Sequence, residues 1–182
     1  MASTARASRY LVFPAGPSDA EALGRVHVTS WRETYRDLLP EPYLARMSET
    51  AHARRFRFGL LRPGPGDVTL AAEGPAGLVG YAQGGASRSR IDGEAEIHTL
   101  YVLRRAQGQG VGRELVQSSA RAFLAAGFRT LMISVLRDNQ PARRFYERIG
   151  GVADAPRLEA GPGPEGRVWE VAYRWPDLRA LV

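Results

Sequence analysis

The chain has 182 residues, 44% of them hydrophobic and 24% charged, which is typical of one globular domain large enough for a real core. It has no cysteine, which excludes disulfides, thiolate metal ligands and a cysteine nucleophile, and suits a cytoplasmic protein. Its three histidines have no metal-ligand spacing, so we expect no metal. No apolar stretch approaches the roughly 18–20 residues that span a membrane, so we expect no membrane partner.

The net charge of +6 is concentrated in one segment. Residues 104–148 hold nine arginines and three acidic residues, an excess equal to that of the whole chain. No helix-turn-helix, zinc-finger or aromatic RNA-binding pattern accompanies this charge, so we expect no nucleic-acid partner. A small polyanionic cofactor explains such a localised charge more simply than a nucleic acid does. The alternative is a solvated, arginine-rich helix face.

In chain order, residues 1–9 are expected to be a flexible N-terminus, and residues 10–182 a single domain. Hydrophobic periodicity and turn residues predict the elements of that domain. They are a strand at 10–14, helices at 19–32, 41–47 and 49–58, strands at 68–73, 78–84 and 95–102, a helix at 113–126, a strand at 130–136, a helix at 140–150, and strands near 151–158 and 168–175. This order predicts a mixed α/β sheet with helices on both faces.

A glycine-rich motif lies between the strand at 95–102 and the helix at 113–126. It reads Gln107-Gly108-Gln109-Gly110-Val111-Gly112. Glycines leave backbone N–H groups accessible, and at a helix N-terminus such groups bind phosphate oxygens. The motif lacks the lysine of a nucleotide P-loop and the G-x-G-x-x-G spacing of a dinucleotide site. It therefore indicates a different phosphate-bearing ligand.

A second cluster lies at the start of the following helix and reads Asn139-x-x-Ala142-x-x-Phe145-Tyr146, ending in Gly150. Together with Q-x-x-G-x-G upstream, it resembles the GCN5-related N-acetyltransferase (GNAT) family, in its small bacterial branch. The resemblance extends over most of residues 10–175. It implies a GNAT fold: a mixed, mostly antiparallel central sheet of about seven strands, flanked by helices on both faces.

The resemblance also implies that acetyl-CoA is the cosubstrate. The exposed backbone at the end of one strand would pair with the pantetheine arm, the glycine motif would hold the pyrophosphate, and the second cluster would flank the cofactor. The residues concerned are Leu100, Tyr101 and Val102, then Gln107, Gly108, Gln109, Gly110, Val111, Gly112 and Arg113, and finally Asn139, Ala142 and Tyr146.

Acid–base roles follow from the same resemblance. Tyr146 would protonate the departing CoA thiolate, because a phenol is a donor at neutral pH; the alternative is a packing residue. Glu96 would accept a proton from the amine, and His98 is a second candidate with a suitable intrinsic pKa. The alternative for Glu96 is a carboxylate that pairs with an arginine. Period-2 alternation places Glu96 and His98 on the same face as Leu100, opposite Ile97, Thr99 and Tyr101.

Trp31 and Tyr35 belong to a W-R-x-x-Y-x-x-L-L-P segment that resembles a broad branch of small bacterial acetyltransferases. They are candidates to contact the acceptor, and the alternative is that they anchor the first helix in the core. We expect an acetyl-CoA-dependent N-acetyltransferase acting on a primary amine of a small molecule, which includes polyamines, or of a peptide or protein. A CoA-binding sensor without turnover is the alternative. Family members are often dimers, so a homodimer is one option.

Overall fold

The computed structural model describes residues 9–161 and 166–182. Residues 1–8 of the expected flexible N-terminus, and most of the turn expected to join the last two strands, lie outside the described residues.

The fold is built on one sheet of eight strands in the order β1-β2-β3-β4-β5-β8-β6, with β7 also paired to β8. All neighbours are antiparallel except β4 and β5. The predicted mixed, mostly antiparallel sheet is confirmed, and the strand expected near 151–158 is divided into the two short strands β6 and β7. The strands are β1 Leu11–Pro14, β2 Val68–Gly74, β3 Gly77–Ala86, β4 Glu94–Val102, β5 Thr130–Leu136, β6 Val152–Ala153, β7 Arg157–Ala160 and β8 Arg167–Trp175.

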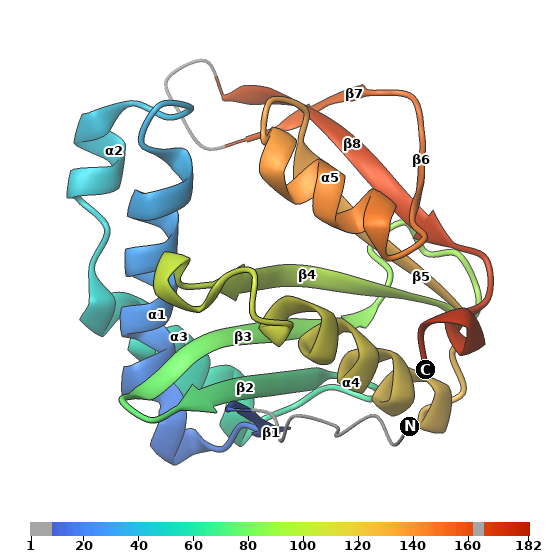
Figure 1. Cartoon of the computed structure of the whole chain (residues 1–182), viewed down its shortest axis with the longest axis horizontal. Coiled ribbons are helices and arrows are strands. Elements are labelled where there is room, and N and C mark those ends of the chain that lie inside the picture. Colours follow the sequence, from blue (N-terminus) through green and yellow to red (C-terminus); the bar gives the residue numbers. More distant parts are fainter. Residues whose placement is uncertain (1–8, 162–165) are drawn as a thin grey trace, which may run out of the picture.

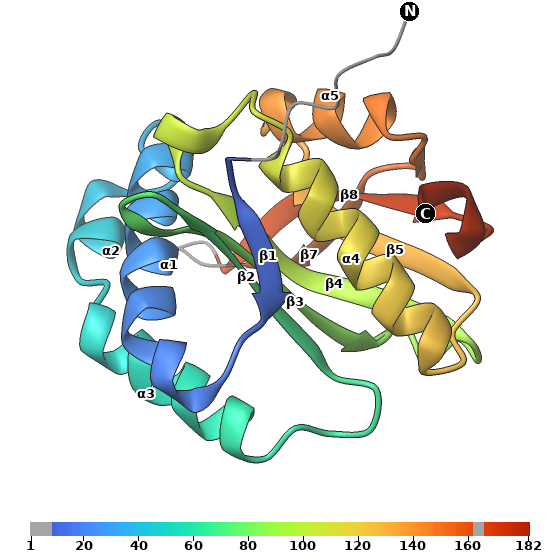
Figure 2. The ribbon, with the colours of Figure 1, turned by 60° about the horizontal axis from the view of Figure 1, so that its bottom comes forward.

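Helices cover both faces of the sheet (Figures 1 and 2). On one face, α1 and α3 pack on β2 and β3, with Leu23, Phe56 and Tyr81 in their core. On the other face, α4 and α5 pack on β4, β5 and β8, with Phe123 and Ile133 among the buried residues. The helices are α1 Ala20–Tyr35, α2 Glu41–Ala45, α3 Glu49–Leu61, α4 Val111–Ala125 and α5 Gln140–Arg148, and short 3₁₀ turns lie at Pro17–Asp19, Arg104–Ala106 and Leu178–Leu181.

A β-bulge interrupts β4, so the alternation expected along this strand is wrong beyond Ile97. In the pairing with β3, Gly84 lies opposite Ile97 and Gln83 opposite Thr99, which leaves His98 as an extra residue. Ile97 packs on the α4 side of the sheet, and Leu100 packs on that same side. Tyr101 packs instead with the residues of α1. Glu96 therefore shares its face with Tyr101 and not with Leu100.

Candidate active site

Strands β4 and β5 form a wedge because they pair over only part of their length. Glu94, Ala95 and Glu96 pair with Thr130, Leu131 and Met132, and beyond them the two strands diverge (Figure 1). We call the space between residues 97–102 of β4 and 133–136 of β5 the wedge. Along it, no strand among the described residues pairs with the free edge of β4. An extended ligand with amide groups can therefore hydrogen-bond there, as an added strand would.

The glycine motif lies next to the wedge and leads into α4. Gly108 has a φ of 71° and Gly110 a φ of 87°, and an added Cβ would meet nothing within 4 Å at either position. Glycine is thus required by backbone conformation and not by crowding. Gly110 is the N-cap of α4, and no side chain caps the helix. The first N–H groups of α4 therefore remain free for an anion.

Glutamine side chains fix the shape of this loop. The Gln107 side-chain amide donates to the carbonyl of Val102 at 2.9 Å, which ties the loop to the end of β4. The Gln109 amide donates to the carbonyl of Arg105 at 2.9 Å, and its oxygen accepts from the Tyr10 hydroxyl at 2.9 Å. These contacts keep both side chains engaged with the protein.

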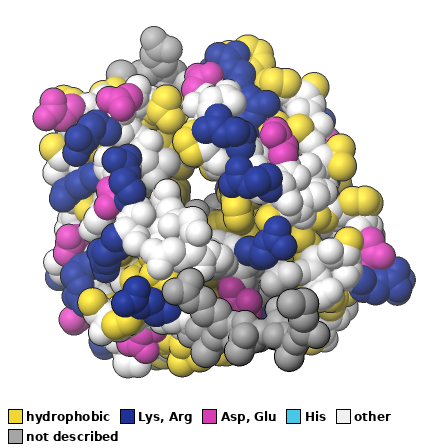
Figure 3. Space-filling model, viewed as in Figure 1, with side chains coloured by type: hydrophobic (Ala, Val, Ile, Leu, Met, Phe, Trp, Pro, Cys, Tyr) yellow, Lys and Arg dark blue, Asp and Glu magenta, His cyan; other side chains and the backbone are white. Residues whose placement is uncertain are grey.

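Positive charge surrounds the hollow between the glycine motif and α5. Figure 3 shows this hollow, with arginine side chains along its rim. A pocket of about 150 Å³ lies between α4, α5 and the C-terminal 3₁₀ turn, and Arg113 and Arg148 contribute its cations. Its apolar lining comes from Val116, Ile149 and Leu181. A second pocket of about 210 Å³ lies on the other side of α4 and includes Tyr10, Gly110 and Arg113.

The second sequence cluster forms the start of α5, as predicted. The Asn139 side-chain oxygen accepts a hydrogen bond from the N–H of Ala142 at 3.3 Å and caps the helix. Close packing follows one turn on, because a Cβ on Gly112 would lie 3.3 Å from the Phe145 ring. The N-terminus of α4 and the body of α5 therefore meet at the side of the wedge.

Tyr146 lies on α5 and is 5% exposed. Its ring packs against those of Phe145, Tyr173 and Trp175. Burial raises its pKa well above the usual value for a phenol, and the nearby Tyr35 and Tyr173 raise it further. The hydroxyl therefore stays protonated at neutral pH and is available as a donor of a proton or a hydrogen bond.

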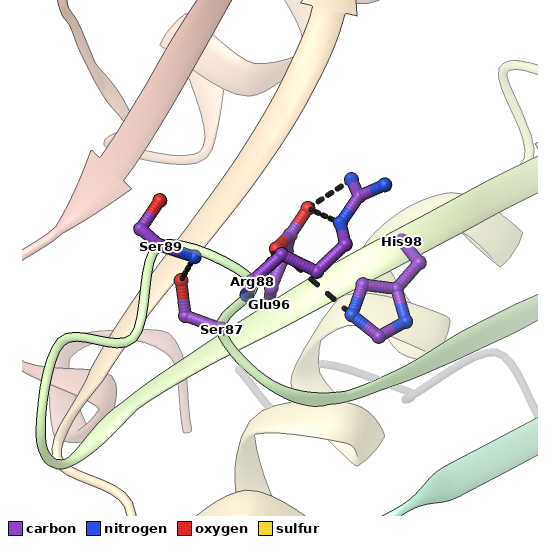
Figure 4. A network of polar contacts seen from close by, with 5 residues as sticks. All are labelled: Ser87, Arg88, Ser89, Glu96 and His98. Carbon is purple, nitrogen blue, oxygen red and sulfur yellow. Dashed lines mark hydrogen bonds and ion pairs between the residues drawn. The ribbon is translucent and has the colours of Figure 1, made fainter.

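Glu96 and His98 come together on β4 (Figure 4). The Glu96 carboxylate is completely buried and accepts from the backbone N–H of Arg88 at 2.9 Å and from its Nε at 3.0 Å. A second guanidinium nitrogen of Arg88 completes the ion pair. His98 Nε2 lies 3.9 Å from Glu96 Oε2. Glu96 thus pairs with an arginine, which was the alternative to a role as catalytic base.

The pKa values of this pair depend on burial and on Arg88. Burial alone would raise the pKa of Glu96, but the hydrogen bonds from the Arg88 side chain and backbone outweigh it, so the pKa is lowered. Burial lowers the pKa of His98, although Glu96 opposes the shift. Glu96 is therefore held as a carboxylate of low basicity.

Trp31 and Tyr35 lie on the last two turns of α1. Both pack in a hydrophobic cluster that also contacts Tyr101 of β4. Tyr35 is 9% exposed, and its hydroxyl lies 3.1 Å from that of Tyr101 on β4. The indole N–H of Trp31 is buried and has no hydrogen-bond partner among residues 9–161 and 166–182. The rings of Trp31, Tyr35 and Tyr101 thus line the side of β4 that faces α1.

Sequence reasoning missed Glu170 of β8. Its strand alternates, with Val171, Tyr173 and Trp175 buried under α5, which places Glu170 on the opposite face of the sheet. It lies directly across from Leu136 at the open end of β5. The alternation along this strand could have predicted which face of the sheet Glu170 lies on. Its position beside the wedge follows only from the pairing of β8 with β5.

Comparison with known proteins agrees with this arrangement. The acetyltransferase (GNAT) family pattern matches residues 28–151. The uncharacterized N-acetyltransferase YuaI of Bacillus subtilis is 31% identical over 166 residues, covering 90% of this chain and 91% of YuaI. The chain therefore belongs to the GNAT family, and it is an acetyl-CoA-dependent N-acyltransferase.

Solved structures share its fold. PaiA N-acetyltransferase of Thermoplasma acidophilum, in complex with coenzyme A, has a TM-score of 0.71 at 19% identity, covering 91% of this chain and 99% of PaiA. The acetyltransferase YncA of Salmonella typhimurium, with its cofactor acetyl-CoA, has a TM-score of 0.68 at 18% identity, covering 93% and 94% of the two chains.

Residues 9–161 and 166–182 contain no group of three or more His, Cys, Asp or Glu side chains that could hold a metal ion. The same residues form no helix that is long and apolar enough to cross a membrane.

Proposed function

We propose that this protein transfers the acetyl group of acetyl-CoA directly to a primary amine. The observation that carries the proposal is the meeting, around one wedge, of an unpaired strand edge, an uncapped glycine-led helix and the protonated phenol of Tyr146. Each feature suits a different part of the reaction: an amide-bearing arm, a pyrophosphate and a leaving thiolate. Family membership supports this combination.

The residues around the wedge fit the cofactor. The open edge of β4 at Leu100, Tyr101 and Val102 would pair with the pantetheine amides. The loop from Gln107 to Arg113 would hold the pyrophosphate on its free N–H groups and on the positive end of α4. Asn139 and Ala142 would flank the arm, and the pocket with Arg113 and Arg148 suits the remaining phosphate-bearing part.

Acetyl-CoA supplies the activated acetyl thioester. The chain has no cysteine, so the amine attacks in a ternary complex and no acyl-cysteine forms. Backbone N–H groups along β4 would orient the thioester and polarise its carbonyl. Tyr146 would give its proton to the departing sulfur. The family resemblance offers Glu96 and His98 as proton acceptors, although the pairing with Arg88 leaves Glu96 with low basicity.

The acceptor would approach from the side of the sheet that faces α1. Trp31, Tyr35 and Tyr101 provide an aromatic wall there, which can hold the apolar body of an amine and accept its cation over the ring faces. These features suit a primary amine on a small molecule, polyamines included, or at the end of a peptide.

Two measurements test the proposal. Acetyl-CoA at about 100 times its Kd should raise the free energy of unfolding by about 2.7 kcal/mol, seen as a higher melting temperature. A panel of alkylamines, polyamines and peptides should then give free thiol and an acetylated product of the expected mass. Binding without turnover of any amine would favour the sensor, and absence of binding by calorimetry would remove the central claim.

A further inference from the structure

Glu170 differs from Glu96 in what surrounds its carboxylate. Both oxygens of Glu96 accept from Arg88, and the Glu96 side chain has no solvent exposure. Glu170 is half-buried, and its carboxylate has no hydrogen bond or ion pair within the described part of the chain. Because a buried charge without a partner is costly, an unpaired carboxylate in a site suggests that a cationic ligand completes it.

Strand pairing places this carboxylate at the wedge. Glu170 lies across from Leu136, the last residue of β5, and such cross-strand neighbours share a face with their Cβ atoms about 4.5–5.5 Å apart. The Leu136 side chain packs in the cluster that contains Tyr35 and Tyr101. Tyr35 is in turn an electrostatic neighbour of both Glu170 and Tyr146.

Four charged groups from three elements face Glu170. Burial raises its pKa above the usual value, Glu159 of β7 and Glu96 of β4 raise it further, and Arg88 of the β3–β4 loop opposes them. Arg157 lies opposite Glu170 in the pairing of β7 with β8. The raised pKa brings this carboxylate closer in basicity to an amine than an ordinary one, which suits proton transfer.

We propose that Glu170 binds the ammonium group of the acceptor and takes its proton, while Glu96 serves to hold Arg88 in place. This inference rests on the proposed acetyl transfer and names the acceptor class: an amine that arrives as a cation.

The step balances as follows. The Glu170 carboxylate takes one proton from R–NH₃⁺ and leaves the neutral amine. A C–N bond forms to the thioester carbon, the C–S bond breaks, and the sulfur takes the proton of the Tyr146 hydroxyl. The extra proton on the new amide nitrogen returns to the Tyr146 phenolate, and Glu170 later releases its proton to water. The products are the amide, the free thiol and one proton.

Enzyme kinetics provide the first test, with the amine of the panel that the wild type acetylates fastest. Glu170→Gln removes the base but keeps the shape, and Glu159→Gln removes a neighbouring charge from an exposed position. We expect Glu170→Gln to lower kcat/KM about 100-fold or more at pH 7 and to regain activity as rising pH deprotonates the amine in solution. Glu159→Gln should stay within about threefold of the wild type, since it leaves the base in place. Both variants should keep the acetyl-CoA thermal shift.

The second test needs no turnover. In ¹³C-carboxyl NMR of the CoA-bound protein, Glu170→Gln identifies the Glu170 resonance. We expect 1,4-diaminobutane to shift that resonance and the uncharged 1,4-butanediol to leave it unchanged. A resonance that neither compound moves, or that both move alike, would overturn the proposal.

The kinetic test can also overturn it. Glu170→Gln activity within about tenfold of the wild type, or a loss equal to that of Glu159→Gln, would show that Glu170 is not the base. Either result leaves acetyl-CoA binding and turnover intact, so it is distinguishable from failure of the proposed function, in which acetyl-CoA does not bind.

Discussion

At the scale of single residues, the ring and the hydroxyl of Tyr146 can be tested separately. Its ring contributes to the core between α5 and β8, whereas its hydroxyl has no hydrogen-bond partner in the described ranges. Tyr146→Phe keeps the ring and removes only the proton donor. We expect kcat to fall well over tenfold with acetyl-CoA affinity little changed, because the proposed proton donor is lost while the rest of the proposed cofactor site is kept. Thiol release and calorimetry measure the two quantities.

Tyr173→Phe is the matched control for that change. The Tyr173 hydroxyl donates to Glu147 at 2.7 Å and accepts from Arg143 at 3.2 Å. Removing it should cost about 1 kcal/mol of stability while kcat stays within about threefold, because neither partner is placed in the proton transfer. Turnover by Tyr146→Phe at the wild-type rate would contradict the assigned role.

At the scale of elements, the junction between the glycine loop and α4 depends on one backbone conformation. Gly110 has a φ of 87°, and a Cβ there would touch nothing. Gly110→Ala therefore tests conformation alone: an L-residue in this region costs about 1–2 kcal/mol. We expect lower stability and, because the N–H groups shift, at least tenfold weaker acetyl-CoA binding by calorimetry.

Gly59→Ala in α3 is the opposite control. The nearest atom to an added Cβ there is the Gln83 amide nitrogen at 4.0 Å, and its φ is not positive. Alanine in a helix is favoured over glycine by up to about 1 kcal/mol, so stability should hold or rise with cofactor affinity unchanged. Equal cofactor binding by wild type and Gly110→Ala would show that the loop does not hold the pyrophosphate.

At the scale of the whole molecule, the sequence predicts what depends on local patterns. The order of strands and helices, the glycine loop before α4 and the Asn139 cap of α5 all follow from residues close together in the chain. Those local motifs also carried the family resemblance, which the comparisons confirm.

What depends on pairing between strands could not be predicted. The bulge at His98 exists only in the register of β4 with β3. It reverses the faces of the residues that follow, so Glu96 comes to share a face with Tyr101. The approach of Glu170 to Tyr35 needs β8 beside β5, two strands separated in the chain by α5, β6 and β7. The periodicity of a single strand shows neither where a bulge falls nor which strand lies beside it.

The ion pair between buried Glu96 and exposed Arg88 makes global stability depend on pH. The folded pKa of Glu96 is lowered, so its stabilising contribution is fully present above the unfolded value of about 4.3 and is lost as pH falls through the folded pKa. Glu96→Gln should lower the free energy of unfolding by about 1–3 kcal/mol at pH 7, and the gap to the wild type should narrow as pH falls below about 4. Urea titrations across this range measure the gap.

Glu73→Gln, at an exposed position of β2, is the control and should differ from the wild type by less than about 0.5 kcal/mol throughout. A gap for Glu96→Gln that stays constant with pH would mean that packing, and not the charge of the pair, makes the contribution.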